Sequence, residues 1–266
     1  MPDARTPGRS VTSKVLGILQ AFESGPPMMS LTQIAESADL ALPTAYRLAT
    51  ELVEWGALQR DEAGRYGIGL RLWEVAQNAG RQLRDAARPH LQDLFSLTQE
   101  TAHLAIREGH EALYIERVYS SNRAPRASRV GGRLPLHATA VGKVLLAYEE
   151  DWFQEAYLAR DLEAPTRRTH VHPLRLREEL ESIRRRGYAT TFEEVRPGSC
   201  SIAVPVVGDP DRAVASIGLV MLATQAPQMQ RYLPVLRGIA QRIEPALRRW
   251  PLAEVLTGRV PVRRSR

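Results

Sequence analysis

The sequence has a single cysteine, Cys200, among its 266 residues. One cysteine cannot build an internal disulfide framework or a cysteine metal cluster, and such scarcity is typical of a reducing compartment. No apolar run approaches the roughly 18 residues that a membrane-spanning helix needs. The first ten residues, MPDARTPGRS, lack the apolar core of a secretory signal. We therefore expect a soluble, cytoplasmic protein.

Basic side chains outnumber acidic ones overall, but not in the N-terminal part. The net charge is +6, and Lys and Arg side chains bind nucleic acids by neutralising phosphates and releasing counterions. Residues 1–77, however, hold seven basic and nine acidic side chains, a net charge of −2, so the rest of the chain carries +8. Any DNA contact in the N-terminal part must therefore depend on particular side chains.

Three helices are predicted in the first 56 residues. Residues 11–24 carry apolar side chains at the spacing of one helical stripe. A second, short helix begins after Ser30, which forms an S-x-x-Q capping box with Gln33. The third spans residues 42–56, which read LPTAYRLATELVEWG. Its proline suits a helix start and its glycine suits a helix end.

The third helix has an uneven outer face. Thr44, Tyr46 and Arg47 lie at its front, whereas Glu51 and Glu54 lie one to two turns further on. The opposite sector is apolar and predicted to be buried, with Ala45, Leu48, Ala49, Leu52, Val53 and Trp55. Because carboxylates are repelled by phosphates, only the front of this helix suits DNA.

Residues 57–69, ALQRDEAGRYGIG, predict two short strands around a turn that Gly64 closes. Two strands after a helix-turn-helix make a winged helix. Arg60 and Arg65 flank the wing tip, where they can reach phosphates. Residues 1–10 are expected to form a flexible basic arm that adds Arg9.

In the remaining chain, the spacing of apolar residues changes from the period of a helix to that of a strand. Residues 70–99 are helical in two pieces with a break near 78–80, and Pro89 is expected to start or kink the second piece. From residue 101 the period is two, which predicts a hairpin over 101–118. Further strands are expected at 127–136, 187–194, 199–208 and 212–222, and helices at 139–149, 151–158, 174–186 and 227–249. Hairpins with helices grouped between them indicate an antiparallel α+β fold.

Four segments carry a resemblance to a known family. The N-terminal two read SLTQIAESADLALPTAYRLATELVEWGAL and YGIGLRLWEVA, and the C-terminal two read GGRLPLHATAVGKVLLA and GYATTFEEVRPGSCSIAVPVV. With them, residues 11–250 resemble the IclR family of bacterial transcriptional regulators. The resemblance implies a winged helix-turn-helix, a linker helix and a GAF-like effector domain. It also implies homodimers, often dimers of dimers, on double-stranded operator DNA.

The family pattern implies DNA contacts at the front of the third helix and on the wing. Arg47 can bind guanine in a bidentate manner or clamp a phosphate, and Thr44 can bond to either. The alternative is that these are solvated first-turn residues with a capping role. The predicted DNA-binding residues are Thr44, Tyr46, Arg47, Arg60, Arg65 and Arg9.

The stretch RLPLHATAVGK ends a strand and starts a helix near Thr139. Free N–H groups and the helix dipole make such a start an anion site; Thr139 can cap it, and His137 can add a proton-dependent charge. The alternative is a capped helix packed on a sheet, with His137 bonded in the core. In related regulators this loop lines the ligand pocket, which implies effector contacts at His137, Ala138, Thr139 and Ala140.

Alternating side chains of the last strands are expected to form the opposite wall of the ligand pocket. The family pattern implies that Thr191, Ser201, Gly218 and Val220 face the effector. Relatives that sense very small polar acids carry more polar groups at the last two of these positions. Glycine and valine there imply a roomier, more apolar pocket, so we predict an aromatic or other mid-sized carboxylate as effector.

Other reactive residue types suggest no catalysis. Glu193 and Glu194 are adjacent and point to opposite faces of a strand, so at most one faces the pocket. Cys200 has no CxxC partner and is interpreted as a small buried residue. His170 and His172 lack further ligands at metal spacing. We expect no catalytic residues, no metal site and no cofactor.

The leading hypothesis is a DNA-binding regulator, more often a repressor than an activator in this family, controlled by a small organic acid. Two alternatives remain open: an enzyme on the GAF-like domain with a helix-turn-helix appendage, and a regulator whose C-terminal domain only oligomerises. The expected boundaries are an arm at 1–10, a DNA-binding domain at 11–69, a helical linker at 70–80, an effector domain at 81–250 and a disordered basic tail at 251–266.

Overall fold

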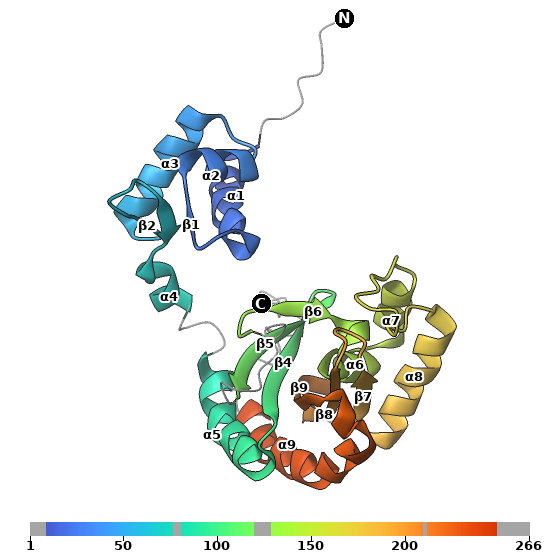
Figure 1. Cartoon of the computed structure of the whole chain (residues 1–266). Helices are drawn as coiled ribbons and strands as arrows, with labels where there is room; N and C mark the ends of the chain where they lie inside the picture. The colour runs from blue at the N-terminus through green and yellow to red at the C-terminus, as the bar shows by residue number, and fades with distance from the viewer. Residues whose placement is uncertain (1–8, 77–80, 120–128, 210–211, 249–266) are drawn as a thin grey trace, which may run out of the picture. The chain divides into compact units, whose positions relative to one another are not determined.

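The computed structural model describes residues 9–76, 81–119, 129–209 and 212–248. The chain divides into two compact units, Met1–Arg81 and Gln82–Arg266 (Figure 1). Most of the expected arm and all of the expected tail at 251–266 lie outside the described residues. Among the described helices, none is both long and apolar enough to cross a membrane.

The first unit is a three-helix bundle with a small sheet. Its elements are α1 (Val11–Ser24), β1 (Met28–Met29), α2 (Leu31–Ser37), α3 (Leu42–Trp55), β2 (Leu58–Arg60), β3 (Tyr66–Ile68) and α4 (Leu70–Ala76). The strand order is β1-β3-β2, with both pairs antiparallel. The winged helix-turn-helix is therefore present, and β1 adds a third strand that the sequence did not reveal because two residues carry no alternation.

Local sequence determines where these helices begin and end. The Ser30–Gln33 capping box is formed in both directions, which confirms that prediction. Gly56 ends α3 in the left-handed region, with a φ of 86° that favours glycine. Ile18, Ile34, Leu48 and Tyr66 meet in one fully buried core between the helices and the sheet. Of the residues expected to be buried on α3, Trp55 is instead 44% exposed, at the end of the helix.

The second unit is a six-stranded antiparallel sheet with helices on both faces. Its strands are β4 (Thr101–Glu108), β5 (Glu111–Val118), β6 (Arg133–Pro135), β7 (Ala189–Phe192), β8 (Ser199–Asp209) and β9 (Arg212–Leu222), in the order β6-β5-β4-β9-β8-β7. Its helical elements are α5 (Arg81–Thr98), η1 (Leu136–Ala138), α6 (Ala140–Ala147), α7 (Asp151–Leu158), α8 (Pro173–Arg186), η2 (Ala223–Tyr232) and α9 (Leu233–Arg248). This is the α+β fold that the sequence predicted.

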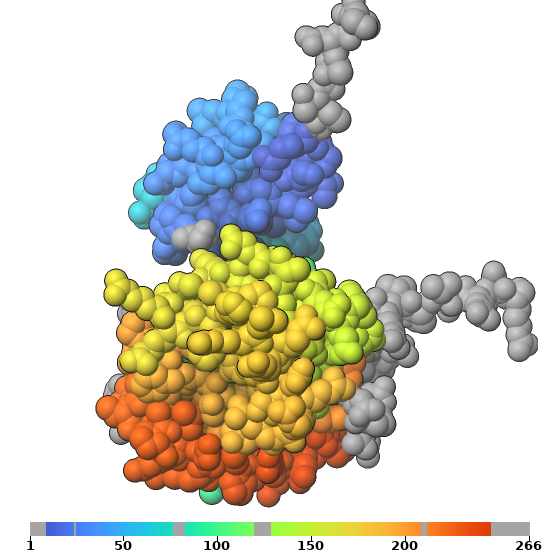
Figure 2. Space-filling view, turned by 90° about the vertical axis from the view of Figure 1, so that its right-hand side faces the viewer, coloured from blue at the N-terminus to red at the C-terminus, as the bar shows by residue number. Residues whose placement is uncertain are grey.

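Two separate cores lie on the two faces of this sheet. One joins α5, η2 and α9 to the side chains of Leu104, Ile202 and Ile217. The other joins α6, α7 and α8 to Ala105 and Ala203, which point to the opposite face. Figure 2 shows α8 and the segment before it (yellow) on the surface of this unit, above η2 and α9 (orange to red). The alternation along β4, β8 and β9 thus separates the two cores, as period two requires.

Three sequence predictions of secondary structure were wrong in detail. Pro89 lies inside α5 and neither starts nor interrupts it. The buried residues Leu83, Ala87, Leu91 and Leu94 on both sides of the proline hold the helix on the sheet despite one lost hydrogen bond. The strand expected over 127–136 is only Arg133–Pro135 in the described part, and the last helix begins at Leu233, after the 3-10 segment η2 that contains Pro227.

We predict that Gly142→Ala destabilises the protein, although alanine is the better helix former. A Cβ at Gly142 would lie 2.5 Å from the carbonyl oxygen of Leu136, so α6 must shift. The expected loss is about 1–3 kcal/mol in the free energy of unfolding, measured by urea denaturation followed by circular dichroism. Gly238→Ala in α9 is the control: its Cβ would meet nothing within 4 Å, so stability should rise. Equal effects at both positions would contradict the close approach of α6.

Candidate functional site

The front of α3 is open and lacks a side-chain cap. The N-cap residue is Ala41, and Pro43 stands in the first turn, so backbone N–H groups there are not satisfied by a capping side chain. Thr44 is half-buried, and Tyr46 is 52% exposed. A helix start with free N–H groups and an exposed hydroxyl-bearing side chain can donate to phosphate oxygens.

Arg47 lies on the same open surface but folds back along the helix. Its Nη1 donates to Glu51 Oε1 at 2.7 Å, and both side chains are more than half exposed. An exposed i,i+4 pair of this kind contributes only about 0.3–0.5 kcal/mol. A guanine edge or a phosphate can therefore replace Glu51 as the partner of Arg47 at little cost.

The wing places its two arginines in different surroundings. Arg65 donates from its backbone N to Asp61 Oδ1 at 2.8 Å and from Nε to Oδ2 at 2.9 Å. These bonds lower the pKa of the Asp61 carboxyl, the backbone bond most of all. Arg60 lies over the ring of Tyr66, with 5.4 Å between the guanidinium carbon and the ring centroid. Both arginines remain exposed on the wing.

Arg9 is not part of a free arm. Its Nη1 donates to the carbonyl oxygen of Ala38 at 2.7 Å, and its Nη2 donates to that of Ser13 at 3.3 Å. Ala38 is the C-cap of α2, where carbonyls lack partners within the helix and a cation is favoured. The sequence could not show this contact because the two residues are 29 positions apart.

In the second unit, a cavity opens between α6 and the sheet. It holds about 600 Å³ of empty space, counted out to its open mouth. Its lining comprises His103, Tyr114, Leu134, Thr139, Ala140, Val141, Thr191, Glu194, Val195, Arg196, Ser199, Cys200, Ser201, Ile202, Gly218, Leu219 and Val220. Six of the eight predicted effector residues are among them: Thr139, Ala140, Thr191, Ser201, Gly218 and Val220.

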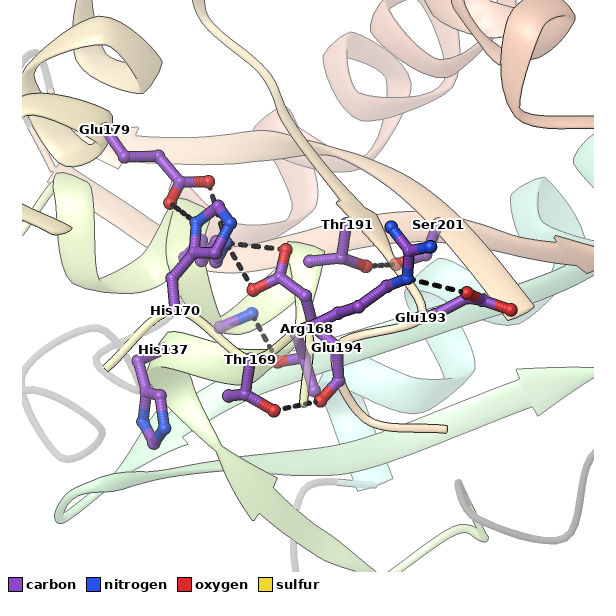
Figure 3. A network of polar contacts seen from close by, with 12 residues as sticks. His137, Arg168, Thr169, His170, Glu179, Thr191, Glu193, Glu194 and Ser201 are labelled. Atoms are coloured by element: carbon purple, nitrogen blue, oxygen red, sulfur yellow. Dashed lines mark hydrogen bonds and ion pairs between the residues drawn. The ribbon is translucent and has the colours of Figure 1, made fainter. Parts of the chain in front are cut away.

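Strand register brings these positions together. Thr191 of β7 pairs with Ser201 of β8, which pairs with Val220 of β9. The hydroxyls of Thr191 and Ser201 lie 2.5 Å apart (Figure 3). On the same face of the sheet, Gly218 of β9 pairs with His103 of β4. Five residues from four strands thus form one surface of the cavity.

The helix above this surface is closely fitted to it. Thr139 is the N-cap of α6, and its Oγ1 accepts a hydrogen bond from Gly142 N at 3.0 Å, as the sequence predicted. A Cβ at Gly218 would lie 3.0 Å from Cγ1 of Val141. The extra room expected at Gly218 is therefore taken up by α6, and the glycine serves a close approach of helix and strand.

His137 and Ala138 do not line the cavity. The His137 Nε2–H donates to the carbonyl of Glu163 at 2.8 Å, so its Nδ1 accepts the bond from the Tyr157 hydroxyl at 2.8 Å. Burial lowers the pKa of His137, which favours the neutral ring over the proton-dependent charge expected from sequence. This bonding within the buried interior is what the alternative interpretation of His137 expected.

The sequence analysis missed His103 and Tyr114. Their rings pack edge to face with centroids 5.2 Å apart, and both are buried. Burial lowers the pKa of His103 to about 3, with a further contribution from the charge of Arg117, so the ring is neutral. Burial raises the pKa of Tyr114. The alternation of Thr101, His103 and Ala105 in β4 was the signal that would have placed His103 on this face.

A buried ion network lies behind the cavity wall. Lys143 of α6 is fully buried, and its Nζ donates to Glu179 Oε1 at 2.7 Å and to Glu194 at 2.8 and 2.9 Å. Burial raises the pKa of Glu194, and the ammonium of Lys143 opposes that rise. His170 Nδ1 lies 2.9 Å from the second oxygen of Glu179 (Figure 3). Of the two adjacent glutamates, only Glu194 lines the cavity, as expected.

His170, Glu179 and Glu194 also place three potential metal ligands within 4.8 Å of one another. The Lys143 ammonium already bonds to both carboxylates, so a cation there would compete with an internal one. Cys200 is buried, its Sγ lies 3.2 Å from the carbonyl of Leu222, and burial raises its pKa to about 11. A thiol with this pKa is a poor nucleophile at neutral pH.

We predict that Lys143→Met destabilises the protein by about 3–5 kcal/mol, because it leaves two buried carboxylates without their shared cation. Denaturant unfolding would measure the loss. Lys14→Met in α1, at the only other lysine of the sequence, should change stability by less than about 0.5 kcal/mol. Adding Glu194→Gln to Lys143→Met should restore part of the loss. A Lys143→Met protein as stable as the wild type would contradict the buried pairing.

Two family models match the chain. The IclR helix-turn-helix domain matches residues 11–62, and the model described as bacterial transcriptional regulator IclR C-terminal matches residues 76–244. Among curated proteins, the HTH-type transcriptional regulator XynR of Escherichia coli (strain K12) is 34% identical over 220 residues, which cover 80% of this chain and 86% of XynR. The transcriptional repressor IclR of the same organism is 29% identical over 197 residues, 72% of each chain.

Solved structures agree with these matches. An IclR homolog of Microbacterium hydrocarbonoxydans, complexed with 4-hydroxybenzoate, superposes with a TM-score of 0.85 at 29% identity, over 91% of this chain and all of the other. The Thermotoga maritima IclR structure has a TM-score of 0.75 at 32% identity, over 89% of this chain and 98% of the other. The chain belongs to the IclR family of bacterial transcriptional regulators.

Proposed function

We propose that this regulator is a repressor that binds operator DNA as a homodimer and responds to a mid-sized organic acid in the cavity beside α6. The cavity is the observation that carries the proposal, because six of the predicted effector residues line it together. A filled core at Thr139 would instead have favoured a C-terminal domain that only oligomerises. The relatives that are transcriptional regulators, one of them named a repressor, support the same reading.

The proposed DNA contacts are few and local. Residues 1–77 carry a net charge of −2, so affinity must come from single guanidinium groups and not from a general basic surface. Arg47 at the front of α3 and Arg60 and Arg65 on the wing are exposed and held only by surface contacts. Arg9 contributes less than the sequence suggested, because its guanidinium is bonded to the end of α2.

We assign DNA binding to residues 11–69, a linker role to 70–80 and effector binding to 81–250. The helix α4, within the proposed linker, has no buried residue. Leu70, Trp73 and Val75 are 74%, 61% and 53% exposed. Three large apolar side chains on seven residues are well suited to packing against a second copy of the chain, which supports the homodimer.

The cavity suits an aromatic carboxylate. Apolar side chains such as Leu134, Val141 and Val220 can contact a ring, and the N-terminus of α6 offers backbone N–H groups to an anion. The relative from Microbacterium hydrocarbonoxydans was solved with 4-hydroxybenzoate, which supports the same ligand class here. Regulation then follows from any difference in affinity of the acid for two arrangements of the chain.

We propose no enzymatic activity for this cavity. Within its described lining, the hydroxyl of Ser201 bonds to that of Thr191, and the thiol of Cys200 bonds to a backbone carbonyl. Glu194 is occupied by Lys143, and His103 is neutral and buried. Nucleophilic catalysis would need a nucleophile activated by a base, whereas the hydroxyl, thiol and carboxylate named here are bonded to other partners.

The ligand class can be tested by calorimetric titration of the full-length protein with 4-hydroxybenzoate, phenylacetate, pyruvate and glyoxylate. We expect the two aromatic acids to bind at least tenfold more tightly than the two small acids, because their rings bury apolar area in the cavity. Tight binding of glyoxylate or pyruvate alone would contradict the predicted class.

The DNA-contacting surface can be tested with Arg47→Ala in an electrophoretic shift assay on the intergenic DNA upstream of the gene. We expect affinity to fall at least about tenfold, since one bidentate contact is worth about 1–3 kcal/mol. Binding of 4-hydroxybenzoate should be unchanged. Glu51→Ala is the matched control on the same helix: it removes only the partner of Arg47, so DNA binding should persist. Unaltered DNA binding by Arg47→Ala would refute this role for α3.

A further inference from the structure

The segment between β7 and β8 forms a fastened loop at the cavity wall. Glu193 has a φ of 56° and Gly198 a φ of 78°, and the Gly198 N–H donates to Glu193 Oε1 at 2.7 Å. The Ser199 hydroxyl donates to the carbonyl of Arg196 at 2.8 Å. This loop therefore presents Arg196 to the cavity from a backbone that is held at both ends.

The acidic residue of this loop is already paired. Arg168 lies across the surface and places Nε 3.0 Å from Glu193 Oε2 (Figure 3). The guanidinium of Arg168 also lies 5.0 Å from the ring centroid of Phe192. Because Glu193 is bonded to both Arg168 and Gly198, it is not available to neutralise Arg196.

Arg196 is the uncommitted positive charge among the described lining residues. His103 is neutral, since burial lowers its pKa to about 3. Lys143 is fully buried, bonded to Glu179 and Glu194, and not part of the lining. The exposed side chain of Arg196 has no hydrogen bond or ion pair with another described residue.

A carboxylate in this cavity needs such a charge. The start of a helix stabilises a nearby anion only modestly. Removing a carboxylate from water costs more than that gain. Glu194 in the same wall adds repulsion, which Lys143 reduces. The neutral donors at α6 therefore do not offset the cost of removing the carboxylate from water. A guanidinium can bind a carboxylate through two parallel N–H bonds and offset the rest of that cost.

We propose that Arg196 is the residue by which the cavity distinguishes carboxylates from uncharged ligands of the same shape. This inference rests on the proposed effector function of the cavity. The ring of the acid packs on the apolar lining, the α6 amides and Thr139 supply neutral donors, and Arg196 closes over the carboxylate as its counter-ion.

The test compares acid–amide pairs in calorimetric titrations of the full-length protein: 4-hydroxybenzoate, phenylacetate and pyruvate, each with its primary amide. The wild type should bind at least one acid about tenfold or more tightly than its amide. Arg196→Gln should lose that preference through weaker binding of the acid, with binding of the amide unchanged. Arg196→Lys should keep part of it, because a lysine retains the charge but not the planar fork.

Arg167→Gln is the matched control. Arg167 is an exposed arginine of the segment before α8 that borders a neighbouring groove and not the cavity, so the acid–amide preference should stay as in the wild type. If Arg196→Gln keeps the acid–amide preference that the wild type shows, Arg196 is not the counter-ion of the acid, and the proposed effector function still stands. If no acid binds the wild type, the effector function fails and this inference fails with it.

Discussion

The buried ammonium of Lys143 is the interaction on which the wall of the cavity beside α6 depends. It joins α6 to Glu179 of α8 and to Glu194 beyond the end of β7, three segments that are distant in sequence. Burying a charge is costly unless it is paired and hydrogen-bonded, so the three side chains hold one another in a single geometry. Glu194 is thereby kept in the cavity wall, and its own carbonyl accepts from the Thr169 hydroxyl at 2.6 Å, which ties the segment before α8 to the same wall.

Charge is used in opposite ways in the two units. In the first unit the arginines that face outward are held by weak surface pairs, such as Arg47 with Glu51. Exchanging such a partner for a phosphate costs little, because exposed pairs contribute at most about 1 kcal/mol. In the second unit Lys143 is fully buried and its pairs are not exchangeable. The exchangeable pairs suit a binding surface, and the fixed pairs suit the frame of a cavity.

Periodicity and capping signals predicted the fold well, because they report local physics. The capping box at Ser30, the glycine end of α3 and the faces of β8 and β9 needed only neighbouring residues. The failures concern contacts between distant segments. His137 is bonded to Tyr157 and Glu163, Arg9 to the end of α2, and His103 lines the cavity only because β4 pairs with β9. The continuity of α5 through Pro89 likewise depends on burial against the sheet.

The cavity lies directly against α6, so a molecule bound in it would contact that helix. Its walls come from the start of that helix on one side and from strands β4, β7, β8 and β9 on the other. The helix has little freedom to absorb a displacement, because a Cβ at Gly142 would meet the Leu136 carbonyl and one at Gly218 would meet Val141. Closely packed interiors transmit small shifts instead of damping them. Under the proposed function, a bound acid would change the balance of states through the spacing of α6 and the sheet, and the Lys143 pairs, which join α6 to α8 and to the segment after β7, would carry that change.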